Sequence, residues 1–103
     1  MQTLREVIKD AENRKMAVGH FNISDLAGLK AIFEAARELR LPIIIGASEG
    51  ERDFIGVKQC AALIKSLREE FDYPIYLNAD DTHSLDKVSE VAEIFKVKPI
   101  TIR

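Results

Sequence analysis

The stretch of this chain richest in reactive groups is 77-LNADDTHS-84, which follows the apolar run 74–77. Its last seven residues carry an amide, two adjacent carboxylates, two hydroxyls and an imidazole. Two close carboxylates can raise the pKa of one of them, which suits a general acid, or they can bind a hard cation. The same residue types form Asx turns and helix caps, so a polar loop that caps the next helix is the structural alternative. On extended backbone, the side chains of Asp80 and Asp81 would point in opposite directions.

A metal site is one hypothesis for this stretch. His83 lies two residues after Asp81, and an aspartate and a histidine at this spacing can ligate zinc. Catalytic zinc needs three protein ligands, and the other histidine of the chain is His20, so the candidate set is His20, Asp81 and His83. A second hypothesis is a receiver-like phosphate-binding module with Asp80 and Asp81 as a magnesium pair. It would also need a phospho-acceptor aspartate and a lysine, and the sequence places neither well.

Two more polar groups of residues follow apolar runs. His20, Asn22 and Ser24 come after the first run, and the motif GASEGE at 46–51, with Ser48 at its centre, comes after the second. In parallel α/β folds ligands bind at the carboxyl ends of the strands, so these residues and 78–83 would converge on one face. The glycines on either side of Ser48 could let backbone N–H groups approach a phosphate, or could simply form a turn.

The runs that must position these residues share one pattern, a proline followed by a series of Ile and Leu. They are LPIII at 41–45, YPIYL at 73–77 and KPITI at 98–102, and MAVG at 16–19 with Phe21 is a weaker fourth candidate. A proline at the first position of a strand removes no ladder hydrogen bond, and a continuous apolar run suits a strand buried on both faces. The sequence therefore predicts four short strands.

Between the strands, apolar residues recur at helical spacing. The predicted helices run over residues 4–11, 26–36, 57–67 and 85–95. Their predicted N-caps are Thr3, which forms a capping box with Glu6, then Ser24, and finally Ser84 with Thr82 as the other candidate. Cys60 lies on the apolar stripe of the third helix, which predicts core packing and not a nucleophile.

The order of elements is a leading helix followed by alternating strands and helices, which predicts an α/β fold with a parallel sheet. No linker divides residues 1–103, so we expect a single domain. Two architectures fit: half of a TIM (β/α)8 barrel, or an open doubly wound sheet of the flavodoxin kind. A closed barrel typically takes about 250 residues, so length alone favours the open sheet.

Composition excludes several classes of function. The chain is 47% hydrophobic and 31% charged, as expected for a soluble globular protein. A net charge of -2, with Lys and Arg spread along the chain, leaves no basic stripe for nucleic acid. No apolar run approaches the roughly 20 residues that span a bilayer, and the N-terminus does not resemble a secretion signal. A single cysteine suits a reducing compartment, so we expect a cytoplasmic location.

Several of these motifs together resemble a known family. The segment 17–56, AVGHFNISDLAGLKAIFEAARELRLPIIIGASEGERDFIG, resembles the start of class II, metal-dependent fructose-bisphosphate aldolases and their ketose-bisphosphate relatives. LNADDTHSLDKV at 77–88 looks like the segment that carries their first metal ligand. The likeness runs from about residue 3 to about residue 93. Those enzymes are closed (β/α)8 barrels, so the resemblance implies the first half of a barrel and favours that architecture over the doubly wound sheet.

The resemblance implies a lyase that reversibly cleaves fructose 1,6-bisphosphate, or a related ketose bisphosphate, to dihydroxyacetone phosphate and an aldehyde. It also implies a zinc ion that acts as a Lewis acid at the carbonyl of dihydroxyacetone phosphate. Matched by position, Asp80 corresponds to the catalytic acid/base. Ser48 corresponds to a serine near the ketose end of the substrate, and Asn22 to an asparagine on the rim of the active site.

The sequence departs from the family at the metal. Position 81 matches the zinc-binding histidine but holds an aspartate, and His83 matches a second histidine that is not the principal ligand. Asp81 could bind zinc, although a carboxylate there adds negative charge beside Asp80 and favours harder ions. The remaining ligands of the family come from later strands. We therefore expect that this chain by itself holds an incomplete zinc site, or no metal, and is inactive.

A non-catalytic scaffold is the alternative function. Four strands leave two bare sheet edges and an uncovered inner face, which is a liability for a soluble protein. Two copies could pair to close an eight-stranded barrel. This reasoning predicts a homodimer or a larger homo-oligomer.

Overall fold

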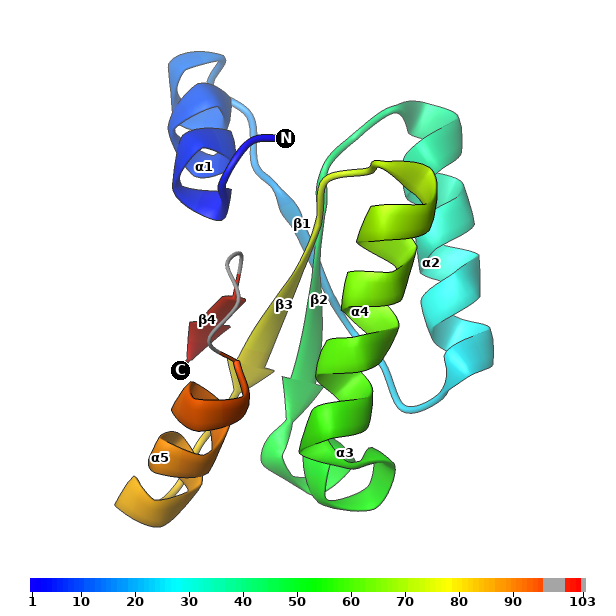
Figure 1. Ribbon diagram of the computed structural model, residues 1–103. Coiled ribbons are helices and arrows are strands. Elements are labelled where there is room, and N and C mark those ends of the chain that lie inside the picture. The colour runs from blue at the N-terminus through cyan, green and yellow to red at the C-terminus, as the bar shows by residue number, and fades with distance from the viewer. Residues whose placement is uncertain (96–99, 103) are drawn as a thin grey trace.

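The computed structural model describes residues 1–95 and 100–102. Its four strands form one parallel sheet, and helices connect them (Figure 1). The strands are β1 (Gly19–Asn22), β2 (Ile43–Ser48), β3 (Ile75–Asp80) and β4 (Ile100–Ile102). The helices are α1 (Leu4–Asn13), α2 (Leu26–Leu39), α3 (Glu49–Ile55), α4 (Val57–Phe71) and α5 (Leu85–Ile94).

The order of the strands decides between the two predicted architectures. Each strand pairs with the one before it in the chain, so the sheet runs β1-β2-β3-β4. A doubly wound sheet reverses its order at a switch point, whereas the strands of a (β/α)8 barrel follow one another around the barrel. The half barrel is confirmed, and the flavodoxin-like sheet is wrong. The receiver-like magnesium hypothesis relied on such a doubly wound sheet, so the strand order does not support it.

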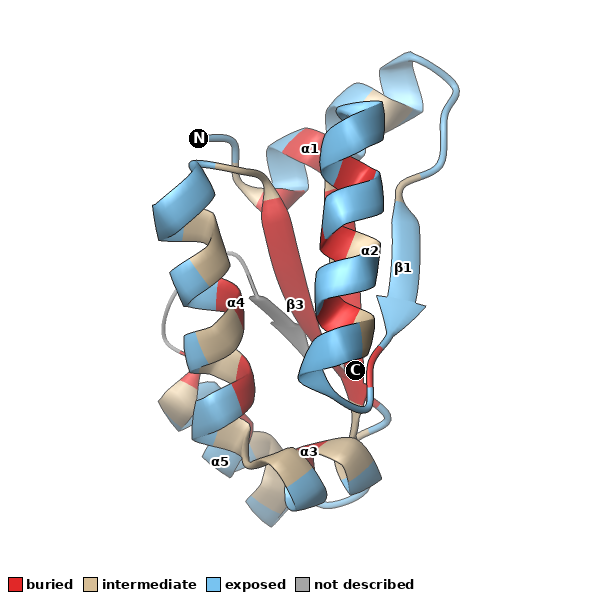
Figure 2. Cartoon of the chain, turned by 90° about the vertical axis from the view of Figure 1, so that its right-hand side faces the viewer, coloured by how far each residue is buried: buried red, intermediate tan, exposed pale blue. Residues whose placement is uncertain are grey.

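One face of the sheet packs against α2, α4 and α5. Alternate residues of the two central strands form this core: Ile43, Ile45 and Ala47 from β2, and Ile75, Leu77 and Ala79 from β3. Figure 2 shows that the buried residues of α2 and α4 lie on the sides of these helices that face the sheet. Cys60 of α4 is buried in the same cluster, and burial raises the pKa of its thiol. The predicted packing role of Cys60 is therefore confirmed.

The opposite face, the inner face of the half barrel, is apolar at the N-terminal ends of the strands. There α1 contributes Leu4 and Val7, which pack around the fully buried ring of Tyr76. The Tyr76 hydroxyl donates a hydrogen bond to the carbonyl oxygen of Gln2, 2.7 Å away. The leading helix thus closes this end of the inner face, and polar side chains are left to the other end.

The first three strands begin later and extend further than the sequence predicted, and residues 98 and 99 of the fourth predicted strand lie outside the described residues. β2 starts after Pro42 and continues through Ser48, and β3 starts after Pro74 and continues through Asp80. Pro74 still takes part in pairing, because its carbonyl oxygen accepts from the Ile43 N–H. β1 likewise begins at Gly19, where the sequence predicted a strand over 16–19 with Phe21. The polar residues after each apolar run stay in the ladder, since backbone pairing does not depend on side-chain polarity.

The helix caps were predicted with one error. The Thr3 and Ser84 hydroxyls accept from the N–H groups of Glu6 and Lys87, as predicted, each at 3.2 Å. The prediction of Ser24 is wrong, because α2 begins at Leu26 and its N-cap is Asp25. The Asp25 Oδ1 accepts from the Gly28 N–H at 2.7 Å.

Some apolar residues in the predicted helical stripes are exposed. They are Ile8, Leu26 and Leu85. Leu26 and Leu85 are each the first residue of their helix, where a side chain reaches past the core.

In the part of the chain that the structure describes, no helix has both the length and the apolar character needed to cross a membrane.

The cap of α2 can be tested by paired substitutions. Asp25→Ala is expected to lower the free energy of unfolding by about 1 kcal/mol, because it removes the acceptor for the Gly28 N–H. Ser24→Ala is the matched control and is expected to change it by less than about 0.5 kcal/mol. Urea unfolding followed by circular dichroism measures both. Equal losses in the two variants would contradict the assignment of Asp25 as the cap.

Candidate functional site

The register of the sheet brings the polar residues of three strands together on the inner face. Asn22 is opposite Gly46, and Gly46 is opposite Asn78. One pleat further along, Ser48 is opposite Asp80. Residues paired across a parallel sheet share a face, and alternate residues along each strand share it too. We call His20, Asn22, Ser48, Asn78 and Asp80 the inner-face polar cluster. It lies toward the C-terminal ends of the strands, where (β/α)8 barrels bind their substrates.

Gly46 makes room for the imidazole of His20. A Cβ built on Gly46 would lie 2.6 Å from Cε1 and Nε2 of His20, and 2.9 Å from Oδ1 of Asn22. The His20 ring therefore covers the backbone of β2 at a point where any larger residue would displace it. A glycine inside a strand often marks such a close approach.

His20 also reaches across β2 to Asn78 on β3. Its Nε2 lies 3.1 Å from Nδ2 of Asn78, whose side chain is buried. In this arrangement the amide donates and Nε2 accepts, so a neutral His20 carries its ring proton on Nδ1. The sequence placed His20 and Asn78 after different strands but did not predict that they would meet.

Asp80 is the last residue of β3 and is buried, only 8% exposed. Asp81, the next residue, is exposed and has a φ of 53°, which is the left-handed conformation. The two adjacent carboxylates are thus in different environments. Asp80 belongs to the inner-face polar cluster, whereas Asp81 lies at the turn that leaves the strand.

His83 does not join the inner-face polar cluster. Its ring is largely exposed, and its Nε2 lies 3.8 Å from Oε2 of Glu49. Its backbone N–H donates to Oε1 of the same carboxylate at 3.5 Å. His20 and His83 therefore have separate partners, and the structure does not bring His20, Asp81 and His83 together. Within residues 1–95 and 100–102, no three His, Cys, Asp or Glu side chains are grouped so that they could hold a metal ion.

Arg52 is a buried charged residue that sequence reasoning missed. Its side chain is 1% exposed, and its Nη1 donates to the carbonyl oxygens of Ala47 and Asp80. Its Nη2 donates to Oγ1 of Thr82 at 3.0 Å, so Thr82 binds this guanidinium and Ser84 caps α5. The helix that carries Arg52, α3, was not predicted either. Its signal in the sequence is S-x-x-E at 48–51, a capping-box pattern that predicts a helix starting at Glu49. The Ser48 hydroxyl does cap α3, accepting from the Glu51 N–H at 3.4 Å.

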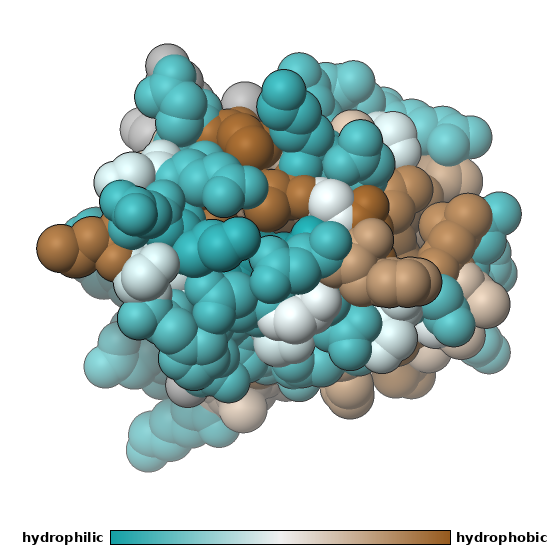
Figure 3. Space-filling model, turned by 90° about the horizontal axis from the view of Figure 1, so that it is seen from below, coloured by the Kyte–Doolittle hydropathy of each residue, from teal (hydrophilic) through white to brown (hydrophobic). Residues whose placement is uncertain are grey.

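The end of the molecule toward which β2 and β3 point carries mostly hydrophilic side chains, with hydrophobic ones between them (Figure 3). Three carboxylates belong to this end: Glu49 on α3, Asp80 at the end of β3 and Asp81 directly after it. The buried guanidinium of Arg52 lies beneath them. The arrangement can accept a proton at Asp80 and can hydrogen-bond to hydroxyl or carbonyl oxygens through His20, Asn22 and Ser48.

Comparison with known proteins identifies the family and the relatives that this chain matches. The family model described as fructose-bisphosphate aldolase class-II matches residues 2–98. The chain is 32% identical over 91 residues to a probable fructose-bisphosphate aldolase of Bacillus subtilis, covering 85% of this chain and 32% of that protein. It is 33% identical over 94 residues to a 6-phospho-5-dehydro-2-deoxy-D-gluconate aldolase of Bacillus licheniformis, covering 88% of this chain and 32% of that protein.

A solved structure agrees in fold. The crystal structure of the YdjI aldolase from Escherichia coli K12 superimposes with a TM-score of 0.78 at 22% sequence identity. The match covers 90% of this chain and 36% of that one. The chain therefore spans about a third of the length of the proteins that it resembles.

The close approach of His20 to Gly46 can be tested by a pair of glycine substitutions. Gly46→Ala is expected to displace the His20 ring, and to lower the free energy of unfolding by less than about 1 kcal/mol, because the ring is the end of an exposed side chain that can move. Gly50→Ala is the control, because its Cβ would meet nothing within 4 Å. It lies inside α3, so it should stabilise the protein by roughly 0.5 kcal/mol. Imidazole NMR signals and urea unfolding measure the two effects, and an unmoved His20 signal in Gly46→Ala would contradict the contact.

Proposed function

Because the chain belongs to the class-II fructose-bisphosphate aldolase family, we propose that it forms the first half of an aldolase active site for a sugar bisphosphate. The observation that carries the proposal is the β2–β3 register, which sets Ser48 beside Asp80 at the C-terminal ends of adjacent strands. Substrates of (β/α)8 barrels bind at that end. The preferred substrate is fructose 1,6-bisphosphate or a related ketose bisphosphate, with dihydroxyacetone phosphate as one product.

Asp80 is the residue that we assign to proton transfer. Aldol cleavage breaks the bond between carbons 3 and 4 of the ketose. The hydroxyl on carbon 4 loses its proton and becomes the aldehyde oxygen, while the electron pair of the broken bond moves to the three-carbon ketose fragment. A carboxylate within hydrogen-bonding reach of that hydroxyl accepts the proton and returns it in the condensation direction. Asp80 supplies such a carboxylate on the inner face.

Asn22 and Ser48 are assigned to substrate binding. Asn22 ends β1 and Ser48 ends β2, so each presents a polar side chain at the mouth of the half barrel. Hydroxyl and amide groups recognise the hydroxyl and carbonyl oxygens of a sugar by donating and accepting hydrogen bonds. His20 extends this set, because its ring lies between Asn22 and Asn78 over Gly46.

The residues of this chain do not by themselves fit the zinc ion that the family implies. Zinc in a catalytic site takes three protein ligands, and in the described part of the chain no three ligating side chains are grouped for a metal. Asp81 and His83 are both exposed, and His83 is turned toward Glu49. The donor set is incomplete, so we propose that Asp81 supplies at most one ligand and that this segment alone does not cleave a sugar bisphosphate.

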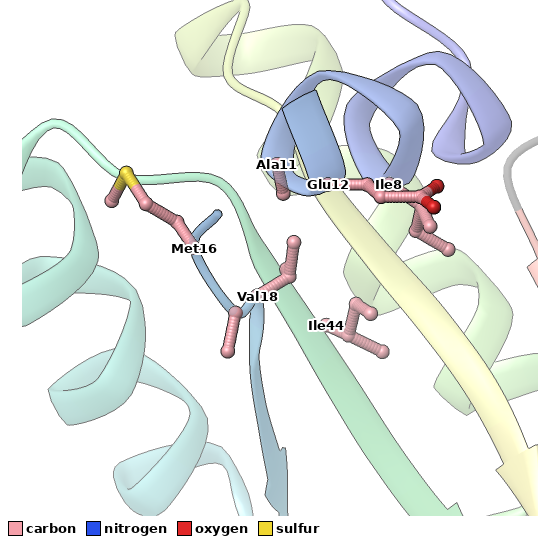
Figure 4. A pocket seen from close by; sticks show the side chains of 7 residues that line it. Ile8, Ala11, Glu12, Met16, Val18 and Ile44 are labelled. Atoms are coloured by element: carbon pink, nitrogen blue, oxygen red, sulfur yellow. The ribbon is translucent and has the colours of Figure 1, made fainter. Parts of the chain in front are cut away.

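A self-assembling half barrel is the second candidate function. β1 lies at the edge of the sheet, and all four of its residues are exposed. Next to it, an apolar hollow of about 480 Å³ opens between α1, the segment that precedes β1, and β2 (Figure 4). Its lining is Ile8, Ala11, Glu12, Met16, Ala17, Val18 and Ile44. A second copy could cover this apolar surface, and twice four strands make the eight of a barrel.

Zinc titration of the protein and of Asp81→His tests the metal part of the proposal. Imidazole is a better zinc ligand than a carboxylate beside a second carboxylate, so the variant is expected to bind zinc about tenfold more tightly. Isothermal titration calorimetry compares the two proteins, with Asp86→His as a control at an exposed position in the first turn of α5. If Asp81→His gains no more affinity than Asp86→His, position 81 is not part of a metal site.

Light scattering after size-exclusion chromatography tests self-assembly. A dimer would have a mass of about 23 kDa, twice the 11.6 kDa of one chain. Met16→Lys places a charge in the apolar hollow and is expected to shift the population toward the monomer, because a buried unpaired charge is costly. Phe54→Lys, at an exposed site on α3, is the control and should leave the assembly unchanged. A monomeric wild-type protein at every concentration would contradict the scaffold hypothesis.

A further inference from the structure

One side of α3 faces the segment that follows β3. Glu49, Arg52 and Asp53 lie on that side, at the spacing of one helical turn. Glu49 contacts His83, Arg52 binds Thr82, and Asp53 pairs with Lys87. Three successive side chains of the α3 face therefore hold the turn after β3 and the start of α5.

The three contacts are unequal. The Lys87–Asp53 pair is 3.1 Å long and the His83–Glu49 pair 3.8 Å, and each has at least one largely exposed partner. Water screens such pairs, and exposed ion pairs contribute little to stability. Arg52 is different, because its guanidinium is buried and makes three hydrogen bonds. A hydrogen bond from a charged donor is roughly twice as strong as a neutral one.

Arg52 has no carboxylate within ion-pair distance among the side chains that the structure describes. Its charge is compensated by the carbonyl oxygens of Ala47 and Asp80 and by the hydroxyl of Thr82. Ala47 is the residue before the end of β2, and Asp80 and Thr82 stand on either side of Asp81. The guanidinium thus ties the C-terminal ends of the two central strands to each other.

The acceptors flank a residue with positive φ. Asp81 has a φ of 53°, a left-handed conformation that aspartate adopts more readily than most residues other than glycine. Arg52 holds the carbonyl oxygen of the residue before it and the hydroxyl of the residue after it. A planar guanidinium with fixed donor directions can hold two such points at a set separation, which a lysine cannot do.

We propose that Arg52 is a positioning residue that fixes the left-handed turn at Asp81 and thereby keeps the Asp80 carboxylate on the inner face. The importance of this role for catalysis rests on the proposed function, but the turn itself does not. Without the guanidinium, Asp81 would relax toward negative φ, and the end of β3 would lose the anchor that sets the direction of Asp80.

The test compares Arg52→Met, Arg52→Lys and Thr82→Val by NMR of the intact chain. A positive φ brings the amide proton of Asp81 close to its own Hα, which gives a strong intraresidue NOE. We expect this NOE to fall to the weaker intensity typical of negative φ in Arg52→Met, and to weaken to a smaller extent in Arg52→Lys. Thr82→Val is expected to weaken it as well, whereas Thr82→Ser, which keeps the hydroxyl, should restore it.

Arg68→Met is the matched control. Arg68 donates to the carbonyl oxygen of Ile75 at 2.8 Å, so it anchors the other end of the same strand. We expect Arg68→Met to lower the melting temperature as Arg52→Met does, while the Asp81 NOE stays unchanged. A general loss of stability would affect the NOE equally in both variants, so this comparison separates positioning from simple stabilisation.

An unchanged Asp81 NOE in both Arg52→Lys and Thr82→Val would overturn the proposal, even if Arg52→Met failed to fold. A weakened Asp81 NOE in Arg68→Met would overturn it too. The measurement requires no substrate and no metal. A failure here therefore leaves the proposed aldolase site untouched, and a failure of that site leaves the turn intact.

Discussion

The parallel register between β2 and β3 is the constraint on which the rest of this structure depends. Because Ile43 pairs with Ile75 and the ladder continues to Ser48 and Asp80, every alternate position of both strands faces the helices. Those positions hold the apolar residues of the core. The intervening positions face the other way and carry Gly46, Asn78 and Asp80. A slip of one residue would bury the polar set beneath the helices and expose the core, and its energetic cost keeps the register in place.

Along the strands, the inner face changes from apolar at one end to polar at the other. Near their N-terminal ends, α1 and Tyr76 fill it with apolar side chains and a hydrogen bond to Gln2. Near their C-terminal ends it is polar, and there the imidazole of His20 reaches over a glycine to the amide of Asn78. Apolar packing and polar side chains are thus at opposite ends of the same strands, and the polar side chains lie at the end where (β/α)8 barrels bind their substrates. The buried Arg52 lies at the polar end, where it hydrogen-bonds to the backbone of both central strands.

Much of the fold could be predicted from local pattern. Thr3 and Ser84 cap their helices as expected, because a hydroxyl immediately before a helix satisfies its free N–H groups wherever the helix lies. Cys60 packs in the core because its helical stripe is apolar on every turn. Ser24 was wrong by one residue, since Ser24 and Asp25 can both cap and only the start of the helix selects between them. The strand ends were wrong because a ladder continues past the last apolar residue.

The sequence by itself determined the alternation of strands and helices, most residues of the core and the positions of Asp80, Ser48 and Asn22 at strand ends. It also carried the family resemblance, through motifs that are local. Only the tertiary structure decided that the strands follow one another around half a barrel, that His20 meets Asn78 and not His83, and that Arg52 is buried beneath the turn at Asp81. Those contacts join residues up to 58 positions apart in the chain. No periodicity or motif records such a separation, because it exists only when the strands are side by side.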